Sequence, residues 1–510
     1  MYSKIYSATT IGISANIVEV EADLSTGMVN FYIVGLPDKA IKESKDRIIA
    51  AFKNSGFRFP EKLLTINLAP ANLKKEDVLF DVPIAIAILQ AEQKLNMTSE
   101  FLEETLFLGE LALDGKIRPV RGVLSITHSA VKKGKKRIII PKENTREASL
   151  IKGIDIIGVE SLTELIAFLR HEQDIKPVPS TFDLFKEKIS KHPLDFNQVK
   201  GQWQAKRALQ IAAAGLHNIL FIGPPGSGKT MLAKRLATIL PSMSFDEIIQ
   251  STKIYSISGL LNRESLVLHR PFRSPHHTIS QAGLVGGGSN PKPGEISLSH
   301  MGVLFLDELT EFKRSTLEVL RQPLESKKVL ISRANMSVEY PASFLLVAAL
   351  NPCPCGYYGD KKKKCVCSYK QIRKYFDKLS GPLLDRIDLH ISVSSVNYED
   401  IQNNSMQNKS SAEMFKEVLL AVKNQEARQG EIKNAFLDPD KIEKYCVLTQ
   451  DAQDTMKIAF EKLNLSMRGY HKILKIARTI ADLQSSDKIE KTHVREAILY
   501  RSLDKDADAA

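Results

Sequence analysis

The feature that most constrains this chain is a glycine-rich segment, GPPGSGKT, at residues 223–230. An apolar run at residues 219–222 precedes it, and a helix-compatible stretch, MLAKRLATIL, follows it. A strand, a glycine-rich loop and a helix start in this order form a phosphate-binding loop, because the loop amides and the helix dipole both attract an anion. A glycine-rich turn that binds nothing would leave this order unexplained. The sequence therefore predicts an α/β core with a nucleoside triphosphate site.

The residues of this loop each have a part in holding a triphosphate and its magnesium ion. Glycines let the backbone amides curl round the β-phosphate, Lys229 neutralises the β and γ oxygens, and Thr230 offers its hydroxyl to Mg²⁺. The predicted nucleotide-binding residues are Gly223, Pro224, Pro225, Gly226, Ser227, Gly228, Lys229 and Thr230.

Two further apolar runs end in side chains suited to the same site. The run at residues 303–306 ends in Asp307, placed to hold a water on Mg²⁺, and Glu308, placed to take a proton from the attacking water. The run at residues 343–350 ends at Asn351, whose carboxamide can bond that water or the γ-phosphate. Surface acids at a strand end and a turn-forming asparagine are the structural alternatives.

The chain is long enough, at 510 residues, for about three domains. Residues 1–170 alternate strand and helix patterns and form an α/β domain, and residues 171–192 form a charged, proline-containing linker. Residues 193–395 form a second α/β domain with a cysteine-rich loop at 351–368, and residues 396–510 are helical.

Particular elements follow from the apolar periodicity. In the first domain we expect strands at residues 28–34, 63–68 and 137–140, helices near residues 40–52, 82–89 and 123–133, and a hairpin at residues 108–120. Near the C-terminus, an amphipathic helix covers residues 473–483, and a last helix carries Val494 and Ile498.

The charge balance suits an acidic partner. The formal net charge is +12 and the isoelectric point is near 9.2, so nucleic acid would be attracted without specific contacts. A generally basic soluble protein is the alternative. Because the first residues lack a signal-peptide pattern and no window is apolar enough to span a bilayer, we expect a cytoplasmic protein without membrane partners.

Four of the five cysteines lie close together in the sequence. Cys353, Cys355, Cys365 and Cys367 supply enough thiolates for a tetrahedral Zn²⁺ site, and unligated reduced thiols are the alternative. The lysine run at residues 361–364 lies between them and is either a solvated charge run or a phosphate-contacting tip. The pair His276 and His277 is expected near the nucleotide or in a structural role, since adjacent residues rarely face one metal ion.

The chain resembles the magnesium-chelatase-like AAA+ ATPases, and within them the bacterial ComM/YifB family. Long segments over nearly the whole chain carry the resemblance. They are NLAPANLKKEDVLFDVPIAIAIL, GPPGSGKT, FRSPHHTIS, PGEISLSHMGVLFLDEL, NPCPCGYYGD, SGPLLDRIDLH and LSMRGYHKILKIARTIADL. The resemblance implies a Lon-protease-like first domain, a central AAA+ domain and a C-terminal helical lid.

Catalytic positions follow from the resemblance residue by residue. Residues 223–230 match the Walker A motif, Asp307 and Glu308 match Walker B, and Asn351 matches sensor 1. Arg386 matches the arginine finger, which reaches the ATP of a neighbouring subunit, and Arg468 matches sensor 2. An ordinary salt bridge is the alternative for either arginine. The glycine-rich segment at residues 282–294 is expected as a mobile loop toward a central channel.

The Lon-like resemblance raises the question of a peptidase. A serine nucleophile needs a nearby lysine base, yet residues 75–88 contain no serine. The segment RGVLSITHS carries Arg121 and His128, and no lysine occurs there before Lys132. The first domain is therefore expected to be catalytically silent.

The resemblance implies an ATP-hydrolysing homohexamer that uses ATP and Mg²⁺ and acts on single-stranded or branched DNA. It further implies a helicase that promotes branch migration in homologous recombination during natural transformation, together with recombination proteins. The competing hypothesis is a chelatase- or chaperone-like ATPase that remodels a protein partner.

Overall fold

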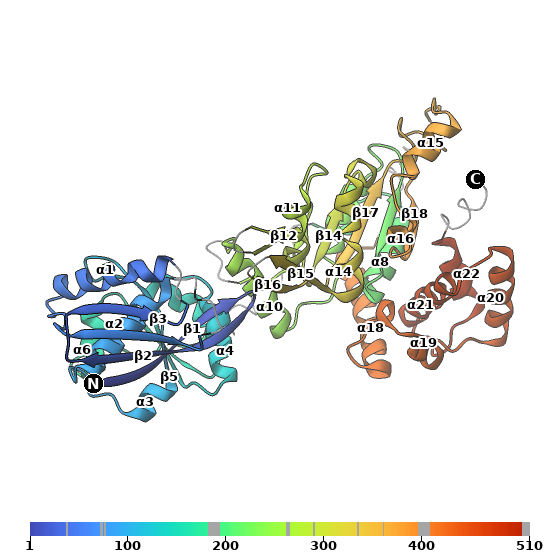
Figure 1. Ribbon diagram of the computed structural model, residues 1–510. Helices are drawn as coiled ribbons and strands as arrows, with labels where there is room; N and C mark the ends of the chain where they lie inside the picture. Colours follow the sequence, from blue (N-terminus) through green and yellow to red (C-terminus); the bar gives the residue numbers. More distant parts are fainter. Residues whose placement is uncertain are drawn as a thin grey trace. The chain divides into compact units, whose positions relative to one another are not determined.

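The computed structural model describes residues 1–36, 39–71, 75, 78–181, 194–261, 266–288, 291–333, 336–360, 362–395 and 409–501. Its contacts divide the chain into two compact units (Figure 1). Unit 1 comprises Met1–Ser190 and Ile248–Leu268, and unit 2 comprises Lys191–Glu247 and His269–Ala510. Residues 182–192 of the expected linker, residues 403–408 of the polar stretch and Lys361 lie outside the described residues.

Unit 1 is built on a seven-stranded mixed sheet with the order β3-β4-β2-β1-β5-β8-β9. Its strands are β1 (Tyr2–Ile11), β2 (Ser14–Ser25), β3 (Asn30–Val34), β4 (Leu63–Ala69), β5 (Thr105–Phe107), β8 (Arg137–Pro141) and β9 (Asp155–Val159). The pairs β1–β2 and β2–β4 are antiparallel, whereas β1–β5, β5–β8, β8–β9 and β3–β4 are parallel. A short hairpin, β6 (Glu110–Leu111) with β7 (Ile117–Arg118), lies outside this sheet.

The core of unit 1 centres on α2 (Asp81–Ala91), whose residues 81–89 are all buried. This helix packs on β1 and β2, and the apolar run from Val82 to Leu89 explains why it needs no solvent-facing side. Its one acidic residue, Asp81, is fully buried and accepts hydrogen bonds from Arg47 Nε (2.8 Å) and Nη2 (3.0 Å). The other helices are α1 (Lys39–Asn54), α3 (Ser99–Glu104), α4 (Val123–Lys132), α5 (Thr145–Ala148) and α6 (Leu162–Leu169).

Unit 2 contains a parallel five-stranded sheet with the order β11-β14-β17-β10-β18. The strands are β10 (Ile219–Ile222), β11 (Phe272–Arg273), β14 (Val303–Leu306), β17 (Leu345–Leu350) and β18 (Leu389–Ser392). The three central strands β14, β17 and β10 are almost completely buried, as their unbroken apolar runs require. Because all neighbouring pairs in this sheet are parallel, crossover connections link the strands.

The helices of unit 2 that precede residue 395 are α8 (Trp203–Gly215), α9 (Lys229–Leu236), α11 (Gln281–Val285), α12 (Glu295–Leu298), α13 (Arg314–Glu318), α14 (Arg321–Ser326), α15 (Tyr369–Phe376) and α16 (Gly381–Leu384). A further helix, α10 (Phe245–Ser258), starts in unit 2 and belongs to unit 1 from Ile248 onward. Unit 2 also contains a hairpin of β15 (Lys328–Arg333) with β16 (Met336–Pro341). The glycine-rich segment is more ordered than we expected, since it contains α11 and the pair β12 (Gly286–Gly287) and β13 (Lys292–Pro293).

The C-terminal helices share one hydrophobic core with the five-stranded sheet. They are α18 (Ser411–Gln429), α19 (Pro439–Tyr445), α20 (Gln450–Lys462), α21 (Met467–Leu483) and α22 (Lys491–Leu499). Both α18 and α21 pack on α8, and His217 Nε2, just after α8, lies 2.7 Å from Thr479 Oγ1 on α21. The amphipathic stripe predicted at residues 473–483 is the face of α21 that enters this core. None of the described helices has the length and apolarity that crossing a bilayer requires.

The shared core predicts a stability effect at Ile476, which is fully buried on α21. Replacement of Ile476 by alanine leaves a cavity and is expected to cost about 2–5 kcal/mol. The chain has a single tryptophan, Trp203, at the start of α8, so urea unfolding followed by tryptophan fluorescence reports on this unit. The control is Ile458→Ala on α20, where the side chain is 53% exposed, and an equal loss in both variants would contradict a shared core.

Candidate nucleotide-binding site

The topology of unit 2 brings the predicted catalytic segments to one edge of the sheet. Strand β17 lies between β14 and β10, and all three are parallel. Their carboxyl ends therefore meet, and the ends of β14, β17 and β10 lead into Asp307, Asn351 and the glycine-rich loop respectively. The crevice beyond the carboxyl ends of such strands is where open α/β sheets bind ligands.

The glycine-rich loop has the backbone conformation that phosphate binding requires. Gly226 and Gly228 have φ angles of +77° and +90°, which side-chain-bearing residues rarely adopt. Helix α9 begins directly at Lys229. The amides of the loop and of the helix start thus form a concave, electropositive surface suited to phosphate oxygens.

Lys229 is held at the centre of the site. Its Nζ donates to the carbonyls of Gly223 (2.6 Å) and Pro224 (3.0 Å) and to Asn351 Oδ1 (3.2 Å). Burial lowers the pKa of Lys229, and the Asp307 and Glu308 carboxylates raise it in part. A buried ammonium held mainly by neutral acceptors gains stabilisation when an anion enters, so the lysine favours phosphate binding.

The two acidic residues follow β14 directly, and Asp307 contacts the phosphate-binding loop. Thr230 Oγ1 donates to Asp307 Oδ2 (2.8 Å), which joins the two oxygen ligands predicted for Mg²⁺. Glu308, directly after Asp307, has φ and ψ near +50°, an uncommon conformation for a residue with a side chain. Its backbone amide donates to Asp307 Oδ1 (3.0 Å), and its side chain is exposed toward solvent.

His277 contacts Glu308 in this site. The sequence predicted only that the pair His276 and His277 would lie near the nucleotide or have a structural role. His277 follows β11, and its Nδ1 lies 3.5 Å from Glu308 Oε2. Its neighbour His276 instead pairs with Thr278 Oγ1 (2.9 Å). The imidazole of His277 is thus placed to orient the carboxylate that we predict to be the general base.

The two arginines predicted by resemblance occupy different surroundings. Arg386 follows α16; its Nη1 donates to the Pro382 carbonyl (2.5 Å) and its Nη2 pairs with Glu325. Its Nε is buried, and no partner is found for it among the described residues. Arg468 lies exposed in the first turn of α21. Their predicted roles as arginine finger and sensor 2 remain predictions.

These side chains fit the Mg²⁺–ATP that the sequence predicts. The ammonium of Lys229 and the loop amides suit phosphates, and Thr230 and Asp307 provide the hard oxygen ligands that Mg²⁺ prefers. Ser227 Oγ in the loop is buried and without a partner among the described residues, so it is available to a ligand.

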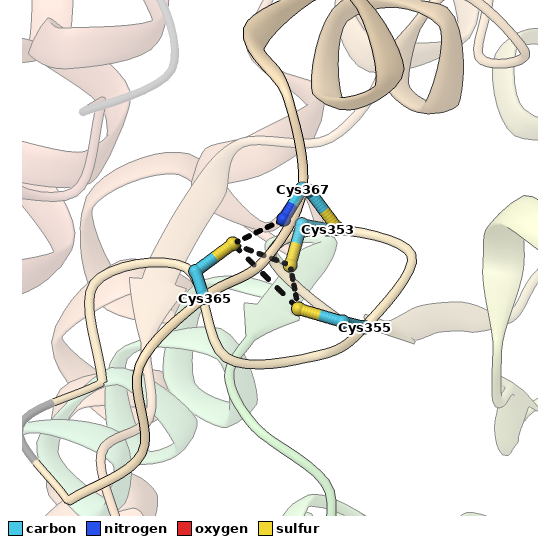
Figure 2. A group of neighbouring side chains, drawn as sticks. All are labelled: Cys353, Cys355, Cys365 and Cys367. Carbon is cyan, nitrogen blue, oxygen red and sulfur yellow. Dashed lines mark hydrogen bonds between the residues drawn. The ribbon is translucent and has the colours of Figure 1, made fainter.

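The four clustered cysteines come together in the loop after Asn351 (Figure 2). Their sulfur atoms all lie within 4.8 Å of one another, and all four are free thiols. Hydrogen bonds from the backbone amides of Val366 and Tyr357 lower the pKa of Cys355 to about 6.

In unit 1, a lysine from a distant segment of the chain contacts His128. Lys253 Nζ lies 2.8 Å from His128 Nδ1, and burial, with the nearby Lys132, lowers the pKa of Lys253 to about 8. Lys75 is fully buried and donates to the carbonyls of Gly35 (2.9 Å), Leu68 (2.8 Å) and Pro70 (2.5 Å). The contact between Lys253 and His128 could not be predicted from a local sequence pattern, because 125 residues separate the two.

The order of the strands and the residues at their ends define unit 2 as a P-loop ATPase core of the AAA+ class. The family model for magnesium chelatase subunit ChlI matches residues 195–401. Models for a further ChlI segment and for the ChlI C-terminal region match residues 20–144 and 408–501.

Comparison with individual proteins narrows the family. The chain is 44% identical to the competence protein ComM of Haemophilus influenzae, over 98% of this chain and 97% of that protein. It is 41% identical to the YifB protein of Escherichia coli, over 99% of this chain and 97% of that protein. A stretch of 228 residues is 26% identical to Lon protease 2 of Bacillus subtilis and covers 39% of this chain and 41% of that protein. The chain belongs to the ComM/YifB family of magnesium-chelatase-like AAA+ proteins.

The site predicts a specific phenotype for Glu308→Gln. The amide keeps the shape of the side chain but accepts no proton, so hydrolysis is expected to fall by about 10²- to 10⁴-fold while ATP binding is retained. Phosphate release and binding of a fluorescent ATP analogue measure the two effects separately. Glu318→Gln on α13 is a matched control, and its activity is expected to equal that of the unmodified protein. A Glu308→Gln protein that still turns over ATP would remove Glu308 from this role.

Proposed function

We propose that this protein is a ring-forming AAA+ motor, a homohexamer, that hydrolyses ATP with Mg²⁺ to move or remodel DNA. In this proposal it is a helicase that promotes branch migration of single-stranded or branched DNA during homologous recombination in natural transformation. It would work in the cytoplasm together with recombination proteins. The observation that carries the proposal is the convergence of Lys229, Thr230, Asp307 and Asn351 at one sheet edge.

Family membership supports the ATPase part of this proposal, and the geometry of the site agrees with it. Lys229 and the loop amides would bind the phosphates, Thr230 and Asp307 would hold Mg²⁺, and Asn351 and Glu308 would position and deprotonate the attacking water. Bound Mg²⁺ would supply charge stabilisation for the phosphoryl oxygens.

A basic surface on the cysteine-rich loop and on α15 supports DNA as the substrate. Helix α15 and the segment between Cys355 and Cys365 carry exposed side chains that suit a phosphate backbone and its bases: Lys362, Lys363, Lys364, Lys370, Arg373, Lys374, Tyr358 and Tyr369. Tyr358 and Tyr369 are 57% and 61% exposed, although aromatic side chains are usually buried. Cations beside exposed aromatic rings are the combination with which proteins hold single-stranded nucleic acid.

Ring formation would complete the site. Arg386 has a guanidinium whose Nε has no partner among the described residues, and its Glu325 partner is 66% exposed. An exchange of this exposed acid for the γ-phosphate of a neighbouring subunit's ATP would cost little, because exposed ion pairs contribute little stability. We therefore propose that Arg386 acts in trans.

The first domain would then serve partner or DNA contact without peptidase activity. Lys75 is occupied by three backbone carbonyls, and Asp81 by Arg47, so the segment at residues 75–88 uses these side chains for structure. In the described residues, Lys253 contacts His128, with no serine hydroxyl found as its partner. A serine–lysine dyad needs such a contact.

A chelatase-type ATPase that remodels a protein partner is the second candidate, and the match to magnesium chelatase subunit ChlI over residues 195–401 favours it. The two candidates differ in their activator. DNA would raise the rate of phosphate release by a DNA motor, whereas only a protein partner would do so for a chelatase-type enzyme.

A mixing experiment tests the role of Arg386. Arg386→Ala and Lys229→Ala should each lower hydrolysis, the former by about 10³-fold or more. Mixed subunits should recover activity, because an intact loop in an Arg386→Ala subunit then meets the arginine of a Lys229→Ala neighbour. The double variant Lys229→Ala with Arg386→Ala is the control and should rescue neither single variant. Without recovery in the mixed sample, Arg386 does not act across an interface.

The exposed cations of α15, the basic helix, predict that their removal weakens DNA binding and lowers its dependence on salt. Lys370→Ala with Lys374→Ala removes two exposed cations of α15 and should weaken single-stranded DNA binding. The slope of log K against log salt concentration should become shallower by about 0.7 for each phosphate that the variant no longer neutralises. Lys457→Ala with Lys462→Ala on α20 removes the same charge elsewhere and serves as the control. Equal weakening in both double variants would indicate general electrostatic attraction and contradict a site on α15.

A further inference from the structure

The sulfur atoms of the cysteine-rich loop have the spacing of a metal site. Cys353 Sγ lies 3.3 Å from Cys355 Sγ and 3.7 Å from Cys365 Sγ, and Cys355 Sγ lies 3.6 Å from Cys365 Sγ (Figure 2). Four sulfurs at about 2.3 Å from one zinc ion lie about 3.8 Å from each other in a tetrahedron. The fourth ligand, Cys367, is within 4.8 Å of the others.

Other uses of four neighbouring thiols fit this geometry less well. A disulfide would bring two sulfurs to about 2.0 Å, and the thiols are free. An iron–sulfur cluster has several metal atoms and needs its cysteines spread around all of them, which a 4.8 Å group does not allow. One soft, tetrahedral divalent cation is the ligand that matches.

The backbone around the sulfurs is arranged for such a site. Gly356 has a φ of +86° and its amide donates to the Cys353 carbonyl (2.9 Å), which turns the chain back between the first pair of ligands and the second. The Cys367 amide donates to Cys365 Sγ (3.4 Å). Amide donors of this kind form the outer shell that orients and stabilises metal-bound thiolates.

The cysteine loop also touches the nucleotide site. Cys353 is fully buried and stands two residues after Asn351, whose carboxamide accepts from Lys229. At Gly356, an added Cβ would lie 2.7 Å from Pro225 Cδ of the phosphate-binding loop. The turn between the ligands therefore packs directly against that loop, and a larger residue would displace one or the other.

The loop is equally close to the basic helix. Cys367 directly precedes Ser368, the N-cap of α15, whose hydroxyl accepts from the Gln371 amide (3.3 Å). A metal bound by Cys365 and Cys367 would thus fix the start of α15 as well as the strand end that carries Asn351.

We propose that Cys353, Cys355, Cys365 and Cys367 bind one Zn²⁺ as four thiolates, and that this ion holds the Asn351 segment and the Gly356 turn against the phosphate-binding loop. The metal site is independent of the proposed DNA motor. Its effect on hydrolysis rests on the proposed ATPase activity, so the two are measured separately.

The metal site is tested by the zinc content of the full-length protein, purified without chelators. We expect about one zinc ion per chain. After removal of the metal under reducing conditions, added Co²⁺ should give the intense visible bands and thiolate charge-transfer absorption of a tetrahedral cobalt site. Zinc-free protein that shows only the weak spectrum of six-coordinate cobalt would overturn the proposal, as would an iron chromophore in the purified protein.

Cysteine variants assign the ligands. Cys365→Ser with Cys367→Ser should reduce zinc content by about tenfold or more, because serine is a poor ligand for zinc. Cys446→Ala removes the fifth cysteine, which is buried at the end of α19, and should keep the zinc. The tryptophan-monitored unfolding transition shows whether each variant is folded. Full zinc content in the folded double variant would exclude these ligands.

Coupling to the nucleotide site is tested in the metal-depleted protein with Zn²⁺ as the only addition. Depletion should weaken binding of a fluorescent ATP analogue and lower the rate of phosphate release by about 10- to 100-fold, as expected when catalytic groups shift by about 1 Å. Restored zinc should reverse both effects. If zinc is present at one ion per chain and its removal leaves nucleotide affinity and rate unchanged, the coupling is wrong. If the zinc-loaded protein binds ATP but hydrolyses none, the proposed ATPase function fails and the metal site stands.

Discussion

The structure of unit 2 depends on one constraint, which is that three buried parallel strands must end at the same edge of a sheet. Strands β10, β14 and β17 are apolar throughout and are covered on both faces, so the polar residues that follow each strand emerge at that edge. Lys229, Asp307 and Asn351 thereby meet, although up to 122 residues separate them in the sequence. The ammonium of the buried Lys229 is hydrogen-bonded mainly to neutral oxygens, so a bound phosphate would stabilise its positive charge further.

The sequence allowed prediction of those parts of the site that rest on local pattern. The strand before the loop, the glycines with positive φ and the acids after β14 are all encoded within a few residues of the chemistry they support. The same holds for α21, whose apolar stripe at residues 473–483 marked the face that packs in the core. The contact of His277 with Glu308 was not predictable, because it depends on β11 being the neighbour of β14.

Unit 1 shows more clearly where local pattern is insufficient. The hairpin of β1 and β2 forms the middle of its sheet, yet we did not predict it, although Val18, Val20, Ala22 and Leu24 alternate with polar residues. The contact between His128 and Lys253 had no local signal at all, since α10 starts in one unit and continues in the other. A search for a lysine in the neighbouring sequence therefore could not find it. Lys75 and Asp81 show that a sequence motif can also mislead about function. Both are charged residues of a family-specific segment, yet here they are buried and make structural hydrogen bonds.

The position of the cysteine loop links these observations. AAA+ motors must change the geometry around the γ-phosphate when ATP is hydrolysed and transmit that change to the substrate. In this chain a single segment after β17 carries Asn351, packs on Pro225 and then leads into α15 with its exposed cations. A flexible loop would absorb a displacement of Asn351 within its own backbone. A loop closed by four ligands to one ion moves as a body, because the ligand geometry tolerates little distortion. Rigid closure of this loop would thus let a small movement at the nucleotide reach the basic helix, and it gives a physical reason for placing four cysteines there.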